Sequence, residues 1–69
     1  MTLQKRKELK SKSQSHLNML NKHYTKMFND TASEYLIETN WKKSSKLMHK
    51  MDVLKNDLAA IYEALEQYA

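Results

Sequence analysis

The side chains best suited to chemistry in this 69-residue chain are three histidines, His16, His23 and His49. Two imidazoles that share a metal within one helix normally lie three or four residues apart and need further ligands from elsewhere. His16 and His23 are seven residues apart, the chain has no Cys, and no carboxylate has a spacing that completes a site. We therefore expect the histidines to border a helix interface, and we predict no metal or other cofactor.

Nucleophilic catalysis needs a serine, cysteine or lysine that is activated by a base inside a pocket that excludes water. The serines here, such as those in the run 11–15, lie among lysines, and the chain has no Gly to form a loop that cradles phosphate. A unit built from a few helices also offers little concavity. We therefore expect a non-enzymatic protein without a small-molecule ligand.

Positive charge is concentrated in two stretches, and the first of them lies near the N-terminus. Five cations against Glu8 alone give residues 1–12 a net charge of +4, which equals the charge of the whole chain. Such residues can neutralise phosphates in a salt-dependent and sequence-independent way. The candidate nucleic-acid contacts are Lys5, Arg6, Lys7, Lys10, Lys12, Lys42, Lys43, Lys46 and Lys50. A solvated chain end and a solvated helix face are the more ordinary explanation of the same lysines.

The only tryptophan, Trp41, follows closely after Tyr35 and Leu36. Packing in a core is the ordinary explanation of such a residue. The alternative is that Tyr35, Leu36 and Trp41 form a hot spot for another protein, because aromatic anchors dominate many interfaces.

These candidates must be positioned by helices, because the chain lacks Gly and Pro and its apolar residues recur three and four apart. A first helical stripe consists of Leu17, Leu20, Tyr24, Met27 and Phe28. A longer one has the core positions Ile37, Asn40, Ser44, Leu47, Met51, Leu54, Leu58, Ile61, Leu65 and Tyr68. This second repeat is typical of a coiled coil. Four flanking side chains widen it into the face of a helical bundle: Leu36, Trp41, Met48 and Tyr62.

The turn between the two helices is predicted at residues 29–31, where Thr31 and Glu34 fit a capping box. The sequence thus predicts an all-α helical hairpin in a single domain, 1–69. Its elements are a helix over 3–28, the turn at 29–31 and a long helix over 32–68, with residues 1–14 a basic segment that is expected to fray. The alternative is three helices with a break near residues 40–45, where Asn40 and Ser44 place polar side chains at core positions.

The unequal lengths of these two helices predict a homodimer. In a hairpin centred on residues 29–31, residue 9 lies near residue 51 and residue 3 near residue 57. Nothing in the first helix then covers Leu58 and the apolar residues that follow it. Each large apolar side chain left in water forgoes roughly 1.5–3 kcal/mol of burial, a large share of the stability of so short a chain. The predicted dimer contact consists of Leu54, Leu58, Ile61, Tyr62, Leu65 and Tyr68.

An antiparallel pairing of the two copies is preferred, and it gives a four-helix-type bundle. It brings the lysines of residues 42–50 against the acidic residues of 57–66, whereas a parallel pairing places the lysines side by side.

No stretch approaches the ~20 apolar residues of a membrane span, and no apolar run follows the basic N-terminal residues as in a secretory signal. We therefore expect a cytoplasmic protein without a membrane partner. The composition, rich in Lys, Asn, Ser and Tyr, resembles that of small accessory proteins of viruses or mobile elements. Together these features predict a small regulatory or adaptor protein that acts by helix-mediated protein–protein interaction, with nucleic-acid binding as the alternative.

Overall fold

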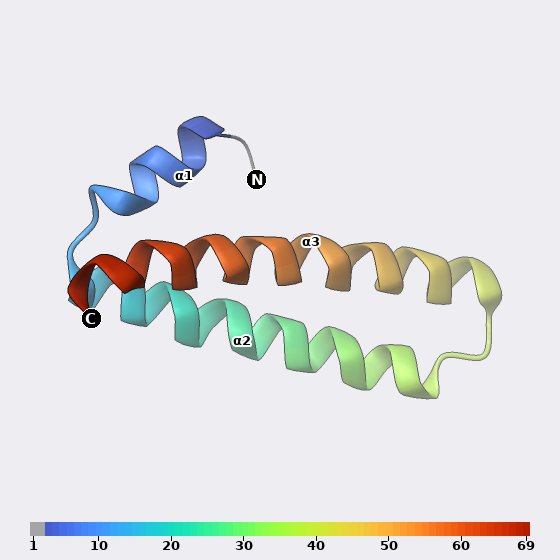
Figure 1. Ribbon diagram of the computed structural model, residues 1–69. Coiled ribbons are helices and arrows are strands. Elements are labelled where there is room, and N and C mark those ends of the chain that lie inside the picture. Colours follow the sequence, from blue (N-terminus) through green and yellow to red (C-terminus); the bar gives the residue numbers. More distant parts are fainter. Residues whose placement is uncertain (1–2) are drawn as a thin grey trace.

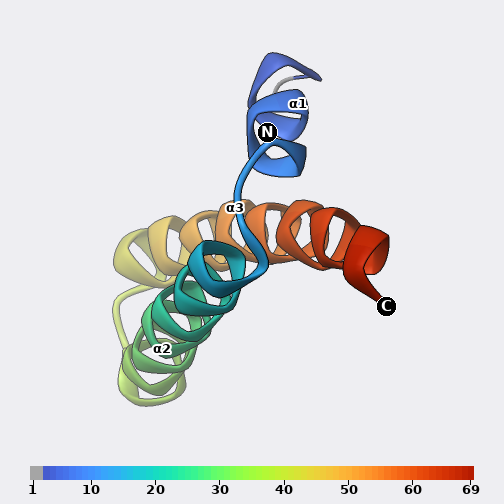
Figure 2. The ribbon, with the colours of Figure 1, turned by 90° about the vertical axis from the view of Figure 1, so that its left-hand side faces the viewer.

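The computed structural model describes residues 3–69, which form three α-helices and a short final 3₁₀ turn. The elements are α1 (Leu3–Lys10), α2 (Gln14–Ile37), α3 (Trp41–Leu65) and η1 (Glu66–Tyr68). α2 and α3 run antiparallel beside each other and form a hairpin, with α1 folded back above α3 (Figure 1). Seen from one end of the hairpin, α3 lies between α1 and α2 (Figure 2). The prediction of an all-α fold is confirmed over the described residues; residues 1 and 2 of the predicted basic segment lie outside them.

The turn of the hairpin lies at residues 38–40, so the prediction of a turn at residues 29–31 is wrong. Thr31 remains inside α2, where its hydroxyl donates a 2.8 Å hydrogen bond to the carbonyl of Met27 and its side chain is buried. A threonine that bonds to the carbonyl four residues earlier satisfies its own hydroxyl within the helix. The capping-box pattern at Thr31 and Glu34 therefore lies inside a continuous helix, and the predicted bounds 3–28 and 32–68 do not hold.

Asn40 is the residue that starts α3. Its side-chain oxygen accepts hydrogen bonds from the backbone N–H of Lys42 at 2.9 Å and of Lys43 at 3.4 Å. The carboxylate of Glu38 accepts from the N–H of Asn40 at 3.0 Å, and the hydroxyl of Ser44 donates to the carbonyl of Glu38 at 3.4 Å. Asparagine is a preferred N-cap because its oxygen satisfies N–H groups that have no partner within the helix.

The alternative of three helices with a break near residues 40–45 is closer to the structure. The break itself occupies residues 38–40, and a second break at residues 11–13 separates α1 from α2. This second break falls in the serine-rich run, where the hydroxyl of Ser13 caps α2 by accepting from the N–H of His16 at 3.2 Å.

The core lies at the end of the hairpin opposite the turn, where all three helices meet. Leu17 of α2 and Ile61 of α3 are fully buried, and Leu9 of α1 packs with them against Ala60 and Ala64. Small side chains opposite large ones let helices interlock closely. The two alanines therefore form the surface of α3 on which α1 rests.

The register predicted for the second helix is correct between residues 44 and 65. Its large apolar members are buried or half-buried: Leu47, Met51, Leu54, Leu58, Ile61 and Leu65. They are covered because α2, with 24 residues, matches α3, with 25. The argument that the end of this helix lacks cover is therefore wrong, since Ile61 is buried and Leu58 and Leu65 are half-buried within one chain. The register fails at its ends, where Ile37 and Tyr68, expected in the core, are exposed.

Replacing Asn40 with alanine is expected to lower the free energy of unfolding by about 1 kcal/mol, because two N–H groups of α3 lose their acceptor. Asn29→Ala is the matched control. It makes the same substitution at an exposed position inside α2, where alanine favours the helix, so stability should stay unchanged or rise. Thermal unfolding followed by circular dichroism measures both, and about 1 kcal/mol corresponds to roughly 4–8 °C in a domain of this size. A larger loss of stability in Asn29→Ala than in Asn40→Ala would instead place the turn at residues 29–31.

Candidate protein-interaction surface

Three large apolar side chains are exposed at the turn end of the hairpin. Leu36 and Ile37 end α2 and are 82% and 81% exposed, and Trp41 begins α3 and is 73% exposed. Side chains of these types are usually buried, and exposed apolar groups that gather in one place are typical of interaction sites. We call Leu36, Ile37 and Trp41 the apolar tip.

The apolar tip is held by the hydrogen bonds of the turn, since the three-helix core lies at the other end of the hairpin (Figure 1). The N–H of Glu38 donates to the carbonyl of Tyr35 at 3.4 Å and ends α2, and Asn40 starts α3 as described above. The ammonium of Lys42 lies 5.8 Å from the centroid of the Trp41 ring, within cation–π range. The backbone that carries the three apolar side chains is therefore fixed on both sides of the turn.

The sequence-predicted hot spot matches the apolar tip in two of its three residues. Leu36 and Trp41 are brought to the same end of the hairpin, whereas Tyr35 is half-buried. Ile37 was missed because the pattern placed it in the core. The signal that could have identified it is Asn40 as an N-cap, because a helix that starts at Trp41 leaves Ile37 at the end of the preceding helix.

A groove of about 370 Å³ next to the turn is lined by both signs of charge. Glu34 and Glu38 line it from one side, and Lys43, Lys46 and Leu47 line it from α3. Carboxylates beside lysines keep the local potential from being uniformly positive. Such a surface suits a protein with charged side chains of its own better than a phosphate backbone.

Carboxylates occur among several of the predicted nucleic-acid contacts. The carboxylate of Glu63 lies 3.8 Å from a guanidinium nitrogen of Arg6 and 3.6 Å from the ammonium of Lys10. Lys43 and Lys46 share the mixed-charge groove described above. The remaining candidates are all exposed: Lys5, Lys7, Lys12, Lys42 and Lys50.

Most residues predicted for the dimer contact do not lie on an open surface. Four of the six are buried or half-buried within the chain: Leu54, Leu58, Ile61 and Leu65. Tyr62 and Tyr68 are exposed, and the hydroxyl of Tyr68 donates a 2.6 Å hydrogen bond to the carbonyl of Lys12 in the same chain. Of the six predicted residues, Tyr62 and Tyr68 are therefore the two that the fold of one chain leaves exposed.

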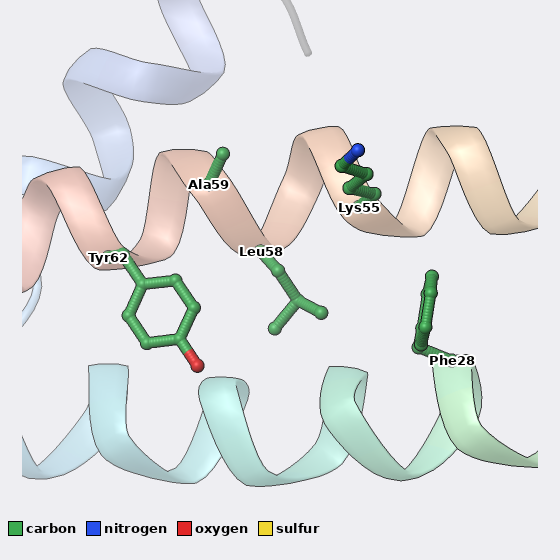
Figure 3. A pocket seen from close by; sticks show the side chains of 5 residues that line it. All are labelled: Phe28, Lys55, Leu58, Ala59 and Tyr62. Atoms are coloured by element: carbon green, nitrogen blue, oxygen red, sulfur yellow. The ribbon is translucent and has the colours of Figure 1, made fainter.

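A second groove, of about 360 Å³, lies between α2 and α3 and is almost wholly apolar. Its lining residues are Phe28 from α2 and Lys55, Leu58, Ala59 and Tyr62 from α3. In Figure 3 the side chains of Leu58 and Tyr62 project toward α2 and Phe28 projects toward α3, whereas Lys55 and Ala59 point away from α2. No sequence motif had marked these residues as a group.

Two further features bear on the kind of site. Among residues 3–69, no group of three or more His, Cys, Asp or Glu side chains is placed to hold a metal ion. Over the same residues no helix combines the length and apolarity needed to cross a membrane.

Comparison with known proteins finds no matching family model, curated protein or solved structure. The proposals below therefore depend on the exposed surfaces of the chain itself.

Leu9→Ala is expected to release α1 from α3, because Leu9 is the side chain through which α1 joins the core and such truncations remove about 2–5 kcal/mol of packing. Amide hydrogen exchange in α1 should then accelerate by at least tenfold. Glu63→Gln is the control, since it removes only two exposed ion pairs worth about 0.2–1 kcal/mol each. Equal acceleration in both variants would mean that charge, and not packing, holds α1 in place.

Proposed function

We propose that this chain is a small non-enzymatic regulatory or adaptor protein that binds another protein through its apolar tip. The observation that carries the proposal is the high exposure of Leu36, Ile37 and Trp41 at one end of the hairpin. Covering a large apolar side chain gains roughly 1.5–3 kcal/mol. Tryptophan is also among the residue types most often found at the energetic centre of an interface.

The turn supports the proposal by reducing what binding has to order. The caps at Glu38 and Asn40 already fix the backbone on both sides of the apolar tip. A surface that is ordered before it meets its partner loses less entropy on binding. The mixed-charge groove beside the turn, with Glu34 and Lys46 among its lining residues, fits a partner with an apolar cleft bordered by charged side chains.

Trp41→Ala and Leu36→Ala are each expected to weaken partner binding by about tenfold or more, because each removes a side chain that the partner would cover. Met19→Ala is the matched control, since Met19 is also a large exposed side chain on the hairpin, at 62%, but lies outside the apolar tip. A photoreactive residue at position 37 identifies the partner, and calorimetric titration with the purified partner gives the affinities.

The native chain supplies an independent readout, because Trp41 is its only tryptophan. Its fluorescence emission should shift to shorter wavelength as the purified partner covers the ring. Undiminished binding by Trp41→Ala, or an equal loss in Met19→Ala, would contradict the proposal.

Nucleic-acid binding is the alternative function, and the exposed lysines such as Lys7, Lys42 and Lys50 favour it. We expect only weak binding to duplex DNA or RNA, because Arg6 and Lys10 are paired with Glu63 and because Lys43 and Lys46 line a groove that also holds carboxylates. Titration of labelled duplexes at rising salt concentration measures this. Affinity that falls by about 1,000-fold between 50 and 200 mM salt, and that is lost on replacing Lys42, Lys46 and Lys50 with glutamine, would favour the alternative.

A further inference from the structure

A second line of residues runs along α3 beside the hairpin core. Its members are Ser45, Met48, Asp52, Lys55, Ala59 and Tyr62, and all six are exposed. They alternate three and four residues apart, the spacing that keeps side chains in line on a helix that packs against another helix. We call these six residues the outer seam.

Most of the outer seam lies on the side of α3 that α1 and α2 leave open, and Tyr62 lies at its border, where its side chain projects toward α2 (Figure 3). The side toward α2 carries buried and half-buried residues such as Leu54 and Leu47, and the side toward α1 carries Ala60 and Ala64. Two of the large apolar side chains that α3 exposes belong to the outer seam, Met48 at 49% and Tyr62 at 54%. The helix thus has a third, uncovered side with the spacing of a helix–helix contact.

We propose that a second copy of this chain covers the outer seam, with the two α3 helices antiparallel about a two-fold axis between residues 53 and 54. This axis places Tyr62 opposite Ser45, Met48 opposite Ala59, and Lys55 opposite Asp52 of the second copy, and each pair occurs twice. The Tyr62–Ser45 and Met48–Ala59 layers each set a large side chain against a small one, and the central layer sets a cation against an anion. The outer seam is therefore complementary to itself in size and in charge.

A parallel pairing lacks this complementarity. It sets each residue against its own equivalent, so that Lys55 meets Lys55 and Asp52 meets Asp52. Like charges in facing positions disfavour an arrangement, and opposite charges select it. The charges of the outer seam therefore favour the antiparallel arrangement.

The apolar groove supplies the matching hole for one of these contacts. Four of its five lining residues are Lys55, Leu58, Ala59 and Tyr62, which are spaced i, i+3, i+4 and i+7 along α3 (Figure 3). In knobs-into-holes packing, four residues on one helix receive one side chain of the facing helix. The proposed axis places Met48 of the second copy opposite the centre of this hole, and methionine adapts well to irregular gaps.

Two charge variants test the pairing. Asp52→Lys sets a lysine against Lys55 of the second copy, and Lys55→Glu sets a glutamate against Asp52, so each variant alone should dimerise at least tenfold more weakly than the native chain. An equimolar mixture should form a heterodimer of native affinity, because every facing pair is then opposite in charge. Sedimentation equilibrium measures all three samples, and the absence of recovery in the mixture would overturn the proposed register.

Cysteine cross-linking tests direction, and the native chain contains no Cys to interfere. Met48→Cys combined with Ala59→Cys should form disulfides between chains. A bond within one chain is excluded, because eleven residues of helix separate the two positions by about 16 Å and a disulfide needs Cα atoms about 4.4–6.8 Å apart. Neither single variant should cross-link to itself. Efficient self-cross-linking of Met48→Cys alone would indicate a parallel pair and overturn the proposal.

Met48→Ala, compared with Val53→Ala, completes the test. Both replace an exposed apolar residue of α3, but only Met48 belongs to the outer seam. Met48→Ala should weaken dimerisation at least tenfold, and Val53→Ala should leave it unchanged within about twofold. A native chain that stays monomeric at concentrations on the order of 500 µM would overturn the proposal. The outer seam shares no residue with the apolar tip, so either proposal can fail without the other.

Discussion

The rest of this structure depends on the burial of Leu17 against Ile61 at the end of the hairpin away from the turn. These two side chains are fully buried, and they meet because the turn at residues 38–40 gives α2 and α3 nearly equal lengths. Leu9 extends the same cluster to α1, so one apolar contact fixes the pairing of the hairpin and the position of the third helix. A chain of this length has a small margin of stability, and a single buried cluster therefore determines much of its architecture.

A core placed at one end leaves the other end to be held by polar groups. At the turn, the side chains of Glu38 and Asn40 hold the backbone by hydrogen bonds, and the large apolar residues nearby point into water. This division separates stability from recognition. Side chains at the apolar tip can change with little effect on the buried cluster, because the two lie at opposite ends of the hairpin.

The sequence predicted the helices and the buried side of α3 better than it predicted the turn. Apolar residues that recur every three and four positions identify the buried side of a helix, and this pattern does not depend on where the chain turns. For this reason the apolar residues from Leu47 to Leu65 were assigned correctly to the buried side. The reversal depends on a choice between two local signals. Thr31 and Asn40 can both cap a helix, and the pattern around Thr31 is the more complete one in sequence. Tertiary pairing decides against it, because only the turn at Asn40 brings Leu17 opposite Ile61. The same error hid Ile37 from the candidate site and suggested an uncovered end that does not exist.

The sequence predicted a broad apolar face for residues 32–68, and the structure shows where its flanking side chains lie. Four side chains flank the register that packs on α2: Leu36, Trp41, Met48 and Tyr62. None of them is buried in the hairpin. Leu36 and Trp41 belong to the apolar tip, and Met48 and Tyr62 belong to the outer seam, so the broad face divides into two exposed surfaces, for each of which we propose a different partner. In the proposed antiparallel pair, the two tips stand at opposite ends of the α3 pair, roughly 35–40 Å apart at 1.5 Å per residue. Such a pair would present two binding sites facing away from each other, an arrangement suited to joining two partner molecules rather than gripping one.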